Sequence, residues 1–272
     1  MSSVAVSKSE RRSFTTVTEM PSKGATSDQL QILVTRYHLA ARWSQNRDIL
    51  EAACGPGVGL GLMASVGRCV VAGDIDPENC RLAQKTYRDR PDICIQMFDA
   101  ECMPFTDRSF DTIILYEALY YIPNVGRFLR EVRRVLRPGG VLLVSSVNCE
   151  WSGFNASPLS TKYYKPREFG AILESQGFAV QLLVGFPEEA DSAGKKIIGM
   201  IRRAAVSLHL IPKTMKGKEW LKRLFYGKMK PIPSELTEGL AVPAKLEPIE
   251  SHPCTSGYRF YYAVAKLNGG GE

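Results

Sequence analysis

The chain has 272 residues, 44% of them hydrophobic, and a formal net charge of +7. This length suits one α/β domain with an elaboration better than two full domains. Residues 195–230 hold eleven Lys or Arg residues and one acid, so the basic charge belongs to one segment. The longest apolar runs fall far short of the ~20 residues of a membrane-crossing helix, so we expect a cytoplasmic protein without one.

Residues 1–27 are rich in Ser and Thr and lack the apolar stretch of a secretory signal, which predicts a flexible tail. A helical pattern follows over residues 28–43, with Asp28 available as its N-cap. From there apolar strands alternate with helices, a rhythm that predicts a parallel sheet. We expect strands at 48–53, 69–74, 93–98, 110–116, 141–146 and 178–184, and helices at 57–65, 78–88, 125–136 and 166–176.

The motif Arg137-Pro-Gly-Gly140 is expected to end a helix and turn the chain. A late segment, residues 258–266, is dense in aromatic and β-branched residues and predicts a last strand. The roughly seventy residues before it are too many for a structureless loop, which indicates a helical insert. We therefore divide the chain into a tail (1–27), a core (28–186), a basic, mainly helical insert (187–256), the last strand (257–267) and a second tail (268–272).

Seven cysteines, an odd number, include no C-x-x-C pair, and no His stands at metal-ligand spacing from them. We expect reduced thiols and no metal site.

The strongest local signal is the glycine-rich segment at residues 48–60, DILEAACGPGVGL. A strand runs there into a turn whose glycines let backbone amides approach a ligand, and the following helix favours an anion at its N-terminus. A dinucleotide fingerprint needs G-x-G-x-x-G, but Leu60 or Leu62 stands at its last position. The spacing therefore weakens a nicotinamide-dinucleotide interpretation.

The acidic strand residue Glu51, followed by C-G-x-G-x-G, resembles motif I of the Rossmann-like S-adenosylmethionine methyltransferases. Later segments resemble the further motifs in order, at residues 70–76, 98–105, 110–111, 131–140 and 177–178. The chain is most similar to the ubiquinone/menaquinone-biosynthesis type. The resemblance implies an α/β fold with a seven-stranded, mostly parallel sheet, an antiparallel last strand and helices on both faces. It also implies an enzyme with S-adenosylmethionine as cofactor and S-adenosylhomocysteine as product.

The resemblance implies a role for each matching residue. Glu51 would face the methionine ammonium, and the turn of Gly55, Gly57 and Gly59 would hold the carboxylate end. Asp74 would accept both ribose hydroxyls, as acids at this position also do for NAD. The remaining expected cofactor contacts are Ile75 on an adenine face, Asp99, Ala100 and Glu101 at the adenine edge, and Tyr116 near the methionine moiety.

Other roles remain open for several acidic residues. Glu51 can be a strand-end acid without a ligand, and Asp99 can close a turn. Asp76, which precedes Pro77, is expected to cap a helix, and Asp111 to be structural.

Methyl transfer from a sulfonium is an in-line displacement, so alignment of acceptor and methyl group supplies most of the acceleration. An acceptor that loses a proton would still benefit from a base. The sequence leaves the catalytic residue unassigned, with five candidates: Glu117, Tyr120, Tyr121, Asn148 and Glu150.

The expected acceptor is a small molecule, lipid-linked or ring-containing, with a hydroxyl as the target. This expectation rests on aromatic residues in the loop after the fifth strand and in the insert: Trp151, Phe154, Trp220, Phe225 and Tyr226. Apolar and basic residues over 195–211 recur at helical spacing, which predicts an amphipathic helix with a basic face. The basic segment fits three roles: a cap over the active site, peripheral contact with an anionic membrane, or nucleic-acid binding. The sequence predicts no particular oligomeric state.

Three other functions fit parts of the sequence. Nucleic-acid methylation is disfavoured because Tyr116-Glu-Ala-Leu119 stands where base-amine methyltransferases carry an N-P-P-Y type motif. A nicotinamide oxidoreductase could use a Tyr-x-x-x-Lys pair, but Tyr262 and Lys266 lie within the expected last strand. A non-catalytic protein that uses the cofactor fold to bind a partner or membrane surface is disfavoured because Glu51 and Asp74 are both present.

Overall fold

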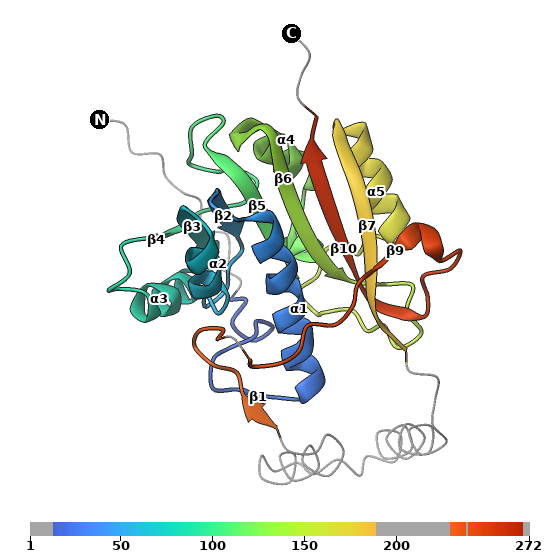
Figure 1. Cartoon of the computed structure of the whole chain (residues 1–272), viewed down its shortest axis with the longest axis horizontal. Coiled ribbons are helices and arrows are strands. Elements are labelled where there is room, and N and C mark those ends of the chain that lie inside the picture. Colours follow the sequence, from blue (N-terminus) through green and yellow to red (C-terminus); the bar gives the residue numbers. More distant parts are fainter. Residues whose placement is uncertain (1–12, 189–228, 238, 269–272) are drawn as a thin grey trace.

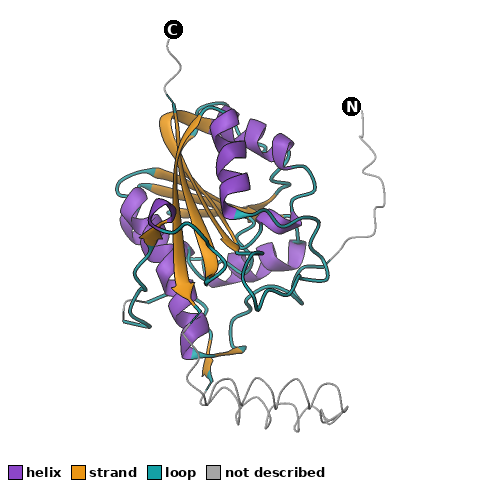
Figure 2. Ribbon diagram, turned by 90° about the vertical axis from the view of Figure 1, so that its right-hand side faces the viewer, coloured by secondary structure: helices purple, strands orange, loops and turns teal. Residues whose placement is uncertain are grey.

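Helices flank both faces of a central sheet in the computed structural model, which describes residues 13–188, 229–237 and 239–268 (Figures 1 and 2). In these ranges the sheet has eight strands in the order β4-β3-β2-β5-β6-β10-β7-β9. Their bounds are β2 Asp48–Ala52, β3 Cys69–Asp74, β4 Ile93–Met97, β5 Phe110–Tyr116, β6 Leu136–Val147, β7 Phe178–Pro187, β9 Glu247–Pro248 and β10 Tyr258–Leu267.

Strands β2 to β6 pair in parallel, and β10 lies antiparallel between β6 and β7. The expected fold class is confirmed, including the antiparallel last strand. The eighth strand, β9, adds only two residues at the outer edge of β7. The chain builds β2, β3 and β4 in one direction and then returns to place β5 on the other side of β2. This reversal opens a crevice at the carboxyl ends of the strands, where α/β sheets bind ligands.

Both faces of the sheet are covered, by α1 (Ser27–Trp43) and α2 (Leu60–Val66) on one side and by α4 (Val125–Val135) and α5 (Pro166–Ser175) on the other. Alternate strand residues supply the two cores, so Leu50 packs toward α4 while Ile49 packs toward α1. Each fully buried aliphatic side chain of this kind stabilises the fold by about 1.5–3 kcal/mol. The remaining helices are α3 (Pro77–Thr86) and the 3₁₀ turns η1 (Leu119–Tyr121) and η2 (Ile249–Ser251).

The first helix begins one residue before the expected start, and its cap differs. Thr26 accepts a hydrogen bond from the amide of Gln29, whose side chain accepts one from Thr26 in return, so Thr26 is the N-cap. Asp28 lies in the first turn and pairs with Arg259 of β10 through two hydrogen bonds of 2.7 Å. The expected cap at Asp28 was wrong because Thr26, two residues earlier, forms the capping box with Gln29.

The motif at residues 137–140 belongs to β6 and does not form a separate turn. β6 begins at Leu136, which pairs with Phe110, and the register shifts before Thr112 pairs with Val141. Gly139 has φ +76°, a conformation that favours glycine. The helix thus passes into the strand through an irregular segment.

Residues 13–27 contact the core, whereas the sequence predicts a flexible tail over residues 1–27. β1 (Gly24–Ala25) pairs with β8 (Lys230–Pro231), and the amide of Phe14 donates to Asp76. These backbone groups find partners on the core and on the insert, which fixes the segment. Residues 1–12 lie outside the described residues.

The described part of the insert contains β8, β9 and η2, and it runs along α1 (Figure 1). Gln31 of α1 donates to the carbonyl of Val242, and Thr35 accepts from the amide of Ala244. Within residues 229–237 and 239–256 the one helical element is the turn η2, and the helix expected over residues 195–211 lies outside the described residues. Most of the basic segment, with Trp220, Phe225 and Tyr226, lies outside the described residues. No helix in the described ranges is both long and apolar enough to cross a membrane.

Candidate functional site

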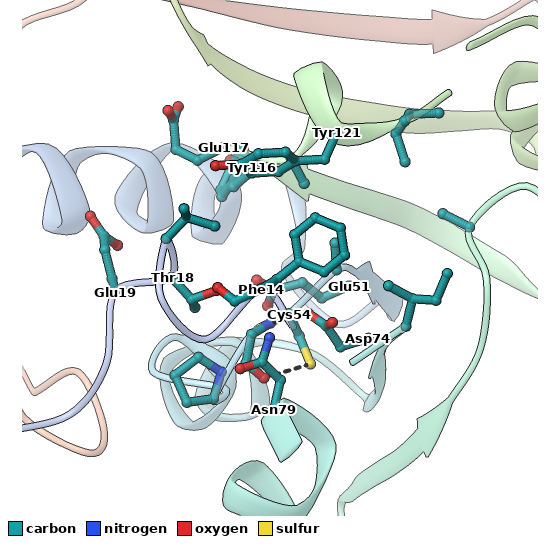
Figure 3. Close-up of a pocket in the computed structure, with 18 of the residues that line it drawn as sticks. Phe14, Thr18, Glu19, Glu51, Cys54, Asp74, Asn79, Tyr116, Glu117 and Tyr121 are labelled. Atoms are coloured by element: carbon teal, nitrogen blue, oxygen red, sulfur yellow. Dashed lines mark hydrogen bonds between the residues drawn. The ribbon is translucent and has the colours of Figure 1, made fainter. Parts of the chain in front are cut away.

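A cavity of about 1010 Å³ opens at the carboxyl ends of β2, β3, β4 and β5 (Figure 3). Of the ten residues that the sequence predicts as cofactor contacts, seven line it: Glu51, Gly55, Asp74, Ile75, Asp99, Ala100 and Tyr116. Gly57, Gly59 and Glu101 do not. The parallel strands bring together side chains that stand far apart in the sequence.

Gly57 and Gly59 shape the turn below the cavity. Gly57 has φ +80°, and its carbonyl accepts a hydrogen bond of 2.9 Å from the Tyr87 hydroxyl. A Cβ on Gly59 would overlap the ring of Tyr37. The glycines therefore permit the turn and let α1 approach it, which accounts for the motif without direct ligand contact by these two residues.

Glu51, at the end of β2, is only 2% exposed. Its Oε1 accepts a hydrogen bond of 2.6 Å from the Tyr37 hydroxyl, whereas its Oε2 has no partner among the described residues. Burial raises the pKa of Glu51 to about 7, against the lowering effects of the Tyr37 hydrogen bond and the Arg36 charge. An unpartnered buried carboxylate oxygen is costly, and a cationic ligand group would relieve that cost.

Asp74, at the end of β3, is 5% exposed and accepts two backbone hydrogen bonds. The amide of Gly55 donates to Oδ2 at 2.9 Å, and the amide of Asp76 donates to Oδ1 at 2.8 Å. Burial raises its pKa despite these bonds. The carboxylate keeps lone pairs for the two hydroxyls of a diol.

Apolar side chains stand beside these acids. Ile75 and Met97 are 53% and 60% exposed, which is unusual for large hydrophobic residues, and both line the cavity. They offer two surfaces for a flat ring. Asp99 lies in the same wall, and its Oδ1 accepts from the amide of Glu101 at 2.8 Å, so it closes a turn and lines the cavity at once.

The other acidic residues behave as expected. Asp76 is the N-cap of α3, where its Oδ1 accepts from the amide of Glu78. Asp111 accepts from the amide of Asp48 and pairs with Arg137, which is a structural role away from the cavity.

The N-terminal segment, residues 13–19, forms a wall of the cavity that the sequence did not predict. Its Phe14 ring meets the Tyr121 ring edge-on at 5.3 Å, and Figure 3 shows Phe14 in the middle of the site. The Phe14 amide and the Ser13 hydroxyl donate to Asp76 Oδ2 at 2.7 and 3.1 Å. A composition rich in Ser and Thr gave no signal of this contact.

Three of the five candidate bases line the cavity: Glu117, Tyr120 and Tyr121. Asn148 donates to the carbonyls of Thr255 and Tyr258, and Glu150 accepts from the Thr255 hydroxyl, so both tie loops together. Trp151 and Phe154 do not line the cavity, and neither does any described residue of the insert.

Glu117 follows β5 with φ +51°, a left-handed conformation that is uncommon outside glycine and often marks functional sites. Its carboxylate accepts from the Ser145 hydroxyl at 3.0 Å and from the Tyr120 hydroxyl at 3.3 Å. Burial raises its pKa to about 7. Among the described residues, no cluster of three or more His, Cys, Asp or Glu could hold a metal ion.

Residues 50–144 match the family described as a methyltransferase domain. A Mycolicibacterium smegmatis protein named as a probable S-adenosylmethionine-dependent methyltransferase is 33% identical over 153 residues, which cover 55% of this chain and 58% of that protein. A Mycobacterium ulcerans protein named phthiotriol/phenolphthiotriol dimycocerosates methyltransferase 1 is 35% identical over 136 residues, covering 46% of this chain and 50% of that one. The chain thus matches only about half the length of these relatives.

The fold is also that of the YcgJ protein from Bacillus subtilis, with a TM-score of 0.54 and 16% identity over 89% of this chain and 100% of that one. The ubiquinone/menaquinone-biosynthesis subtype stays a prediction. The matched stretch contains Glu51, Asp74, Asp99 and Tyr116, which line one cavity. Residues 50–144 thus match a methyltransferase domain, within a fold that is Rossmann-like.

Proposed function

We propose that the chain is an enzyme that transfers the methyl group of S-adenosylmethionine to a hydroxyl of a small, lipid-like or ring-containing acceptor. The observation that carries this proposal is the pairing of two buried carboxylates, Glu51 and Asp74, at the ends of adjacent strands in one cavity. Two neighbouring carboxylates suit a ligand that carries both an ammonium group and a ribose diol. An amino-acid nucleoside such as S-adenosylmethionine carries both groups.

The residues of the cavity fit this cofactor. Glu51 would bind the methionine ammonium through the oxygen that lacks a partner, and Asp74 would accept the ribose hydroxyls. Ile75 and Met97 would sandwich the adenine, and Asp99 would accept from its amine. Gly55 lines the cavity, but its amide, which the sequence assigns to the methionine carboxylate, donates to Asp74 Oδ2.

When bound, the cofactor supplies a methyl group activated on a sulfonium sulfur. The protein's part is to hold the acceptor oxygen in line with that group and to exclude water. Tyr116 lines the cavity, and its ring would attract the cationic sulfur of the cofactor. Phe14 and Tyr121 line the same cavity and give it aromatic surfaces.

The nature of the acceptor is supported by the aromatic lining and by the relatives. Several relatives are named as phthiotriol/phenolphthiotriol dimycocerosates methyltransferases. The substrates in these names are lipid-like. The basic segment, residues 195–230, would attract an anionic membrane surface and bring the enzyme to such an acceptor. Nucleic acid is not the proposed partner.

Transfer of radiolabelled methyl from S-adenosylmethionine to organic-extractable phenols and lipid alcohols tests the proposal. We expect label in the extract with the wild-type protein and a loss of at least about tenfold with Asp74→Asn, since the lost charge weakens a charged hydrogen bond. Asp89→Asn, which changes an exposed carboxylate, is the matched control and retains transfer. Label that enters only nucleic acid or protein would contradict the proposed acceptor class.

A further inference from the structure

Arg36 is a buried cation at the wall of the cavity. It projects from α1 and is 6% exposed, and its Nη2 pairs with the Glu19 carboxylate of the N-terminal segment. Its Nε and Nη1 have no hydrogen-bond partner among the described residues. Unsatisfied donors on a buried charge are costly, so a guanidinium in this state is poised for an acceptor group on a ligand.

Glu117 lines the same cavity and lies close enough for the Arg36 charge to lower its pKa. The two nevertheless form no ion pair within 4.0 Å in the described part of the chain. Ser145 and Tyr120 hold the Glu117 carboxylate from the side of β6 and η1. The two side chains therefore line one cavity, with the Glu117 carboxylate held by hydrogen bonds and two Arg36 nitrogens without a described partner.

We infer that Arg36 and Glu117 form the acceptor subsite and that they take an ionisable hydroxyl on an unsaturated carbon, a phenol or an enol. The inference rests on the proposed function and deepens it. Arg36 donates to the acceptor oxygen, and Glu117 takes the hydroxyl proton. The O–H bond breaks and an O–C bond forms to the methyl group, while the C–S bond breaks and its electron pair stays on sulfur. Glu117 then returns the proton to water.

The chemistry of the pair selects this class of hydroxyl. A carboxylate whose pKa lies at about 7 is matched to a proton that leaves near neutrality. A phenol has a pKa of about 10, as in tyrosine, and an adjacent guanidinium lowers it further. A saturated alcohol holds its proton far more tightly, and this carboxylate would be too weak a base for it.

The aromatic surroundings agree with a flat acceptor. The Tyr120 ring lies 4.6 Å from the Tyr121 ring, and Phe14 meets Tyr121 from the N-terminal segment. All three line the cavity. Offset or edge contacts with such rings favour an aromatic or conjugated ligand.

A direct test of the Arg36 contact uses para-nitrophenol, whose ionised form is yellow and whose neutral form is colourless. Titration with saturating S-adenosylhomocysteine present should show protein-bound probe ionising at lower pH than free probe, by about one unit or tenfold in the ionisation constant. Arg36→Gln should abolish this shift. Arg130→Gln, an exposed arginine of α4 on the opposite face of the sheet, should keep it. A shift that persists in Arg36→Gln, or no shift in the wild type, overturns the inference.

Glu117 is tested by the pH profile of methyl transfer to a phenol. The wild-type rate should rise with pH through about 7 as Glu117 ionises, and Glu117→Gln should lower kcat by about 10²- to 10⁴-fold and remove that rise. The titratable groups near Glu117 come from four elements: Arg36 of α1, Glu19 of the N-terminal segment, Tyr120 and Tyr121 of η1, and Tyr261 and Tyr262 of β10. An unchanged profile in Glu117→Gln contradicts its role as base.

Calorimetric titration with S-adenosylmethionine distinguishes failure of the acceptor subsite from failure of the proposed function. Glu117→Gln should retain cofactor binding, and Arg36→Gln should retain it well above pH 7, where Glu51 is ionised without help from the Arg36 charge. If the wild type binds the cofactor but shows no probe shift, the subsite is wrong and the proposed function stands. If the wild type does not bind the cofactor, the proposed function itself is wrong.

Discussion

The Tyr37 hydroxyl donates a 2.6 Å hydrogen bond to Glu51, which ties α1 to the end of β2 inside the cavity. Both residues are buried, at 4% and 2% exposure. Tyr37→Phe keeps the ring and its packing but leaves Glu51 without a described hydrogen-bond donor. We expect a loss of about 1–3 kcal/mol in the free energy of unfolding and a higher Glu51 pKa. Denaturant unfolding measures the first, and unchanged stability would show that the bond contributes nothing.

The raised Glu51 pKa of about 7 predicts a pH-dependent affinity for S-adenosylmethionine. The ammonium needs an ionised carboxylate, so affinity should rise with pH through about 7 and then level off. Binding near pH 7 should release a proton, which calorimetry in buffers of different ionisation enthalpy detects. Glu51→Gln should weaken binding and abolish the release, while Glu117→Gln should keep it. Release that survives in Glu51→Gln would assign the proton to another group.

The same shift affects stability without ligand. A carboxyl whose folded pKa is raised keeps its proton in the folded state while the unfolded chain loses it. The stability contributed by protonated Glu51 is therefore complete below pH of about 4.5 and is lost as pH rises to about 7. Unfolding free energies of wild type and Glu51→Gln, measured across this window, should differ in slope; equal slopes would contradict the shifted pKa.

Gly59→Ala is expected to be damaging although the backbone conformation there suits any residue. The added Cβ would overlap the Tyr37 ring and displace it from Glu51. We expect a loss of about 1–3 kcal/mol in stability, typical of overpacking, and weaker cofactor binding. Gly126→Ala is the control because a Cβ there meets nothing nearer than 3.4 Å. Equal stability of the two variants would show that α1 can move aside.

Phe14→Ala removes the ring that meets Tyr121 across the cavity. Because the ring shields the site, we expect faster release of bound S-adenosylhomocysteine in stopped-flow measurements, with little change in global stability. Thr16→Ala, an exposed neighbour outside this cavity, should release the ligand at the wild-type rate. Identical release from both variants would mean that the N-terminal segment does not cover the ligand.

Much of the core follows from local sequence signals. Alternating apolar strands and helices predict the parallel sheet, and the bounds of β3 and β5 agree with those expected, residues 69–74 and 110–116. Acids at strand ends are predictable as neighbours because parallel strands end at the same edge. Glu51 and Asp74 are of this kind, and both line the cavity.

The rest depends on tertiary contacts that leave no local pattern. Phe14 reaches the site because Asp76, already the cap of α3, has a second oxygen free for its amide. Arg36 looks like any charged residue on a helix until α1 packs against the cavity. Gly57 and Gly59 belong to the predicted motif. The close approach of Tyr87 to Gly57 and of Tyr37 to Gly59, and not a ligand contact, accounts for glycine at these two positions.

Calorimetric titration of the purified protein with S-adenosylmethionine, and separately with NADH, tests the central claim most directly. The account predicts binding of S-adenosylmethionine alone, weakened about ten- to hundredfold in Asp74→Asn and unchanged in Asp89→Asn. Thermal unfolding of each variant shows that the comparison is between folded proteins. Binding of NADH without S-adenosylmethionine, or equal S-adenosylmethionine affinity in wild type and Asp74→Asn, would contradict the assignment of the cavity.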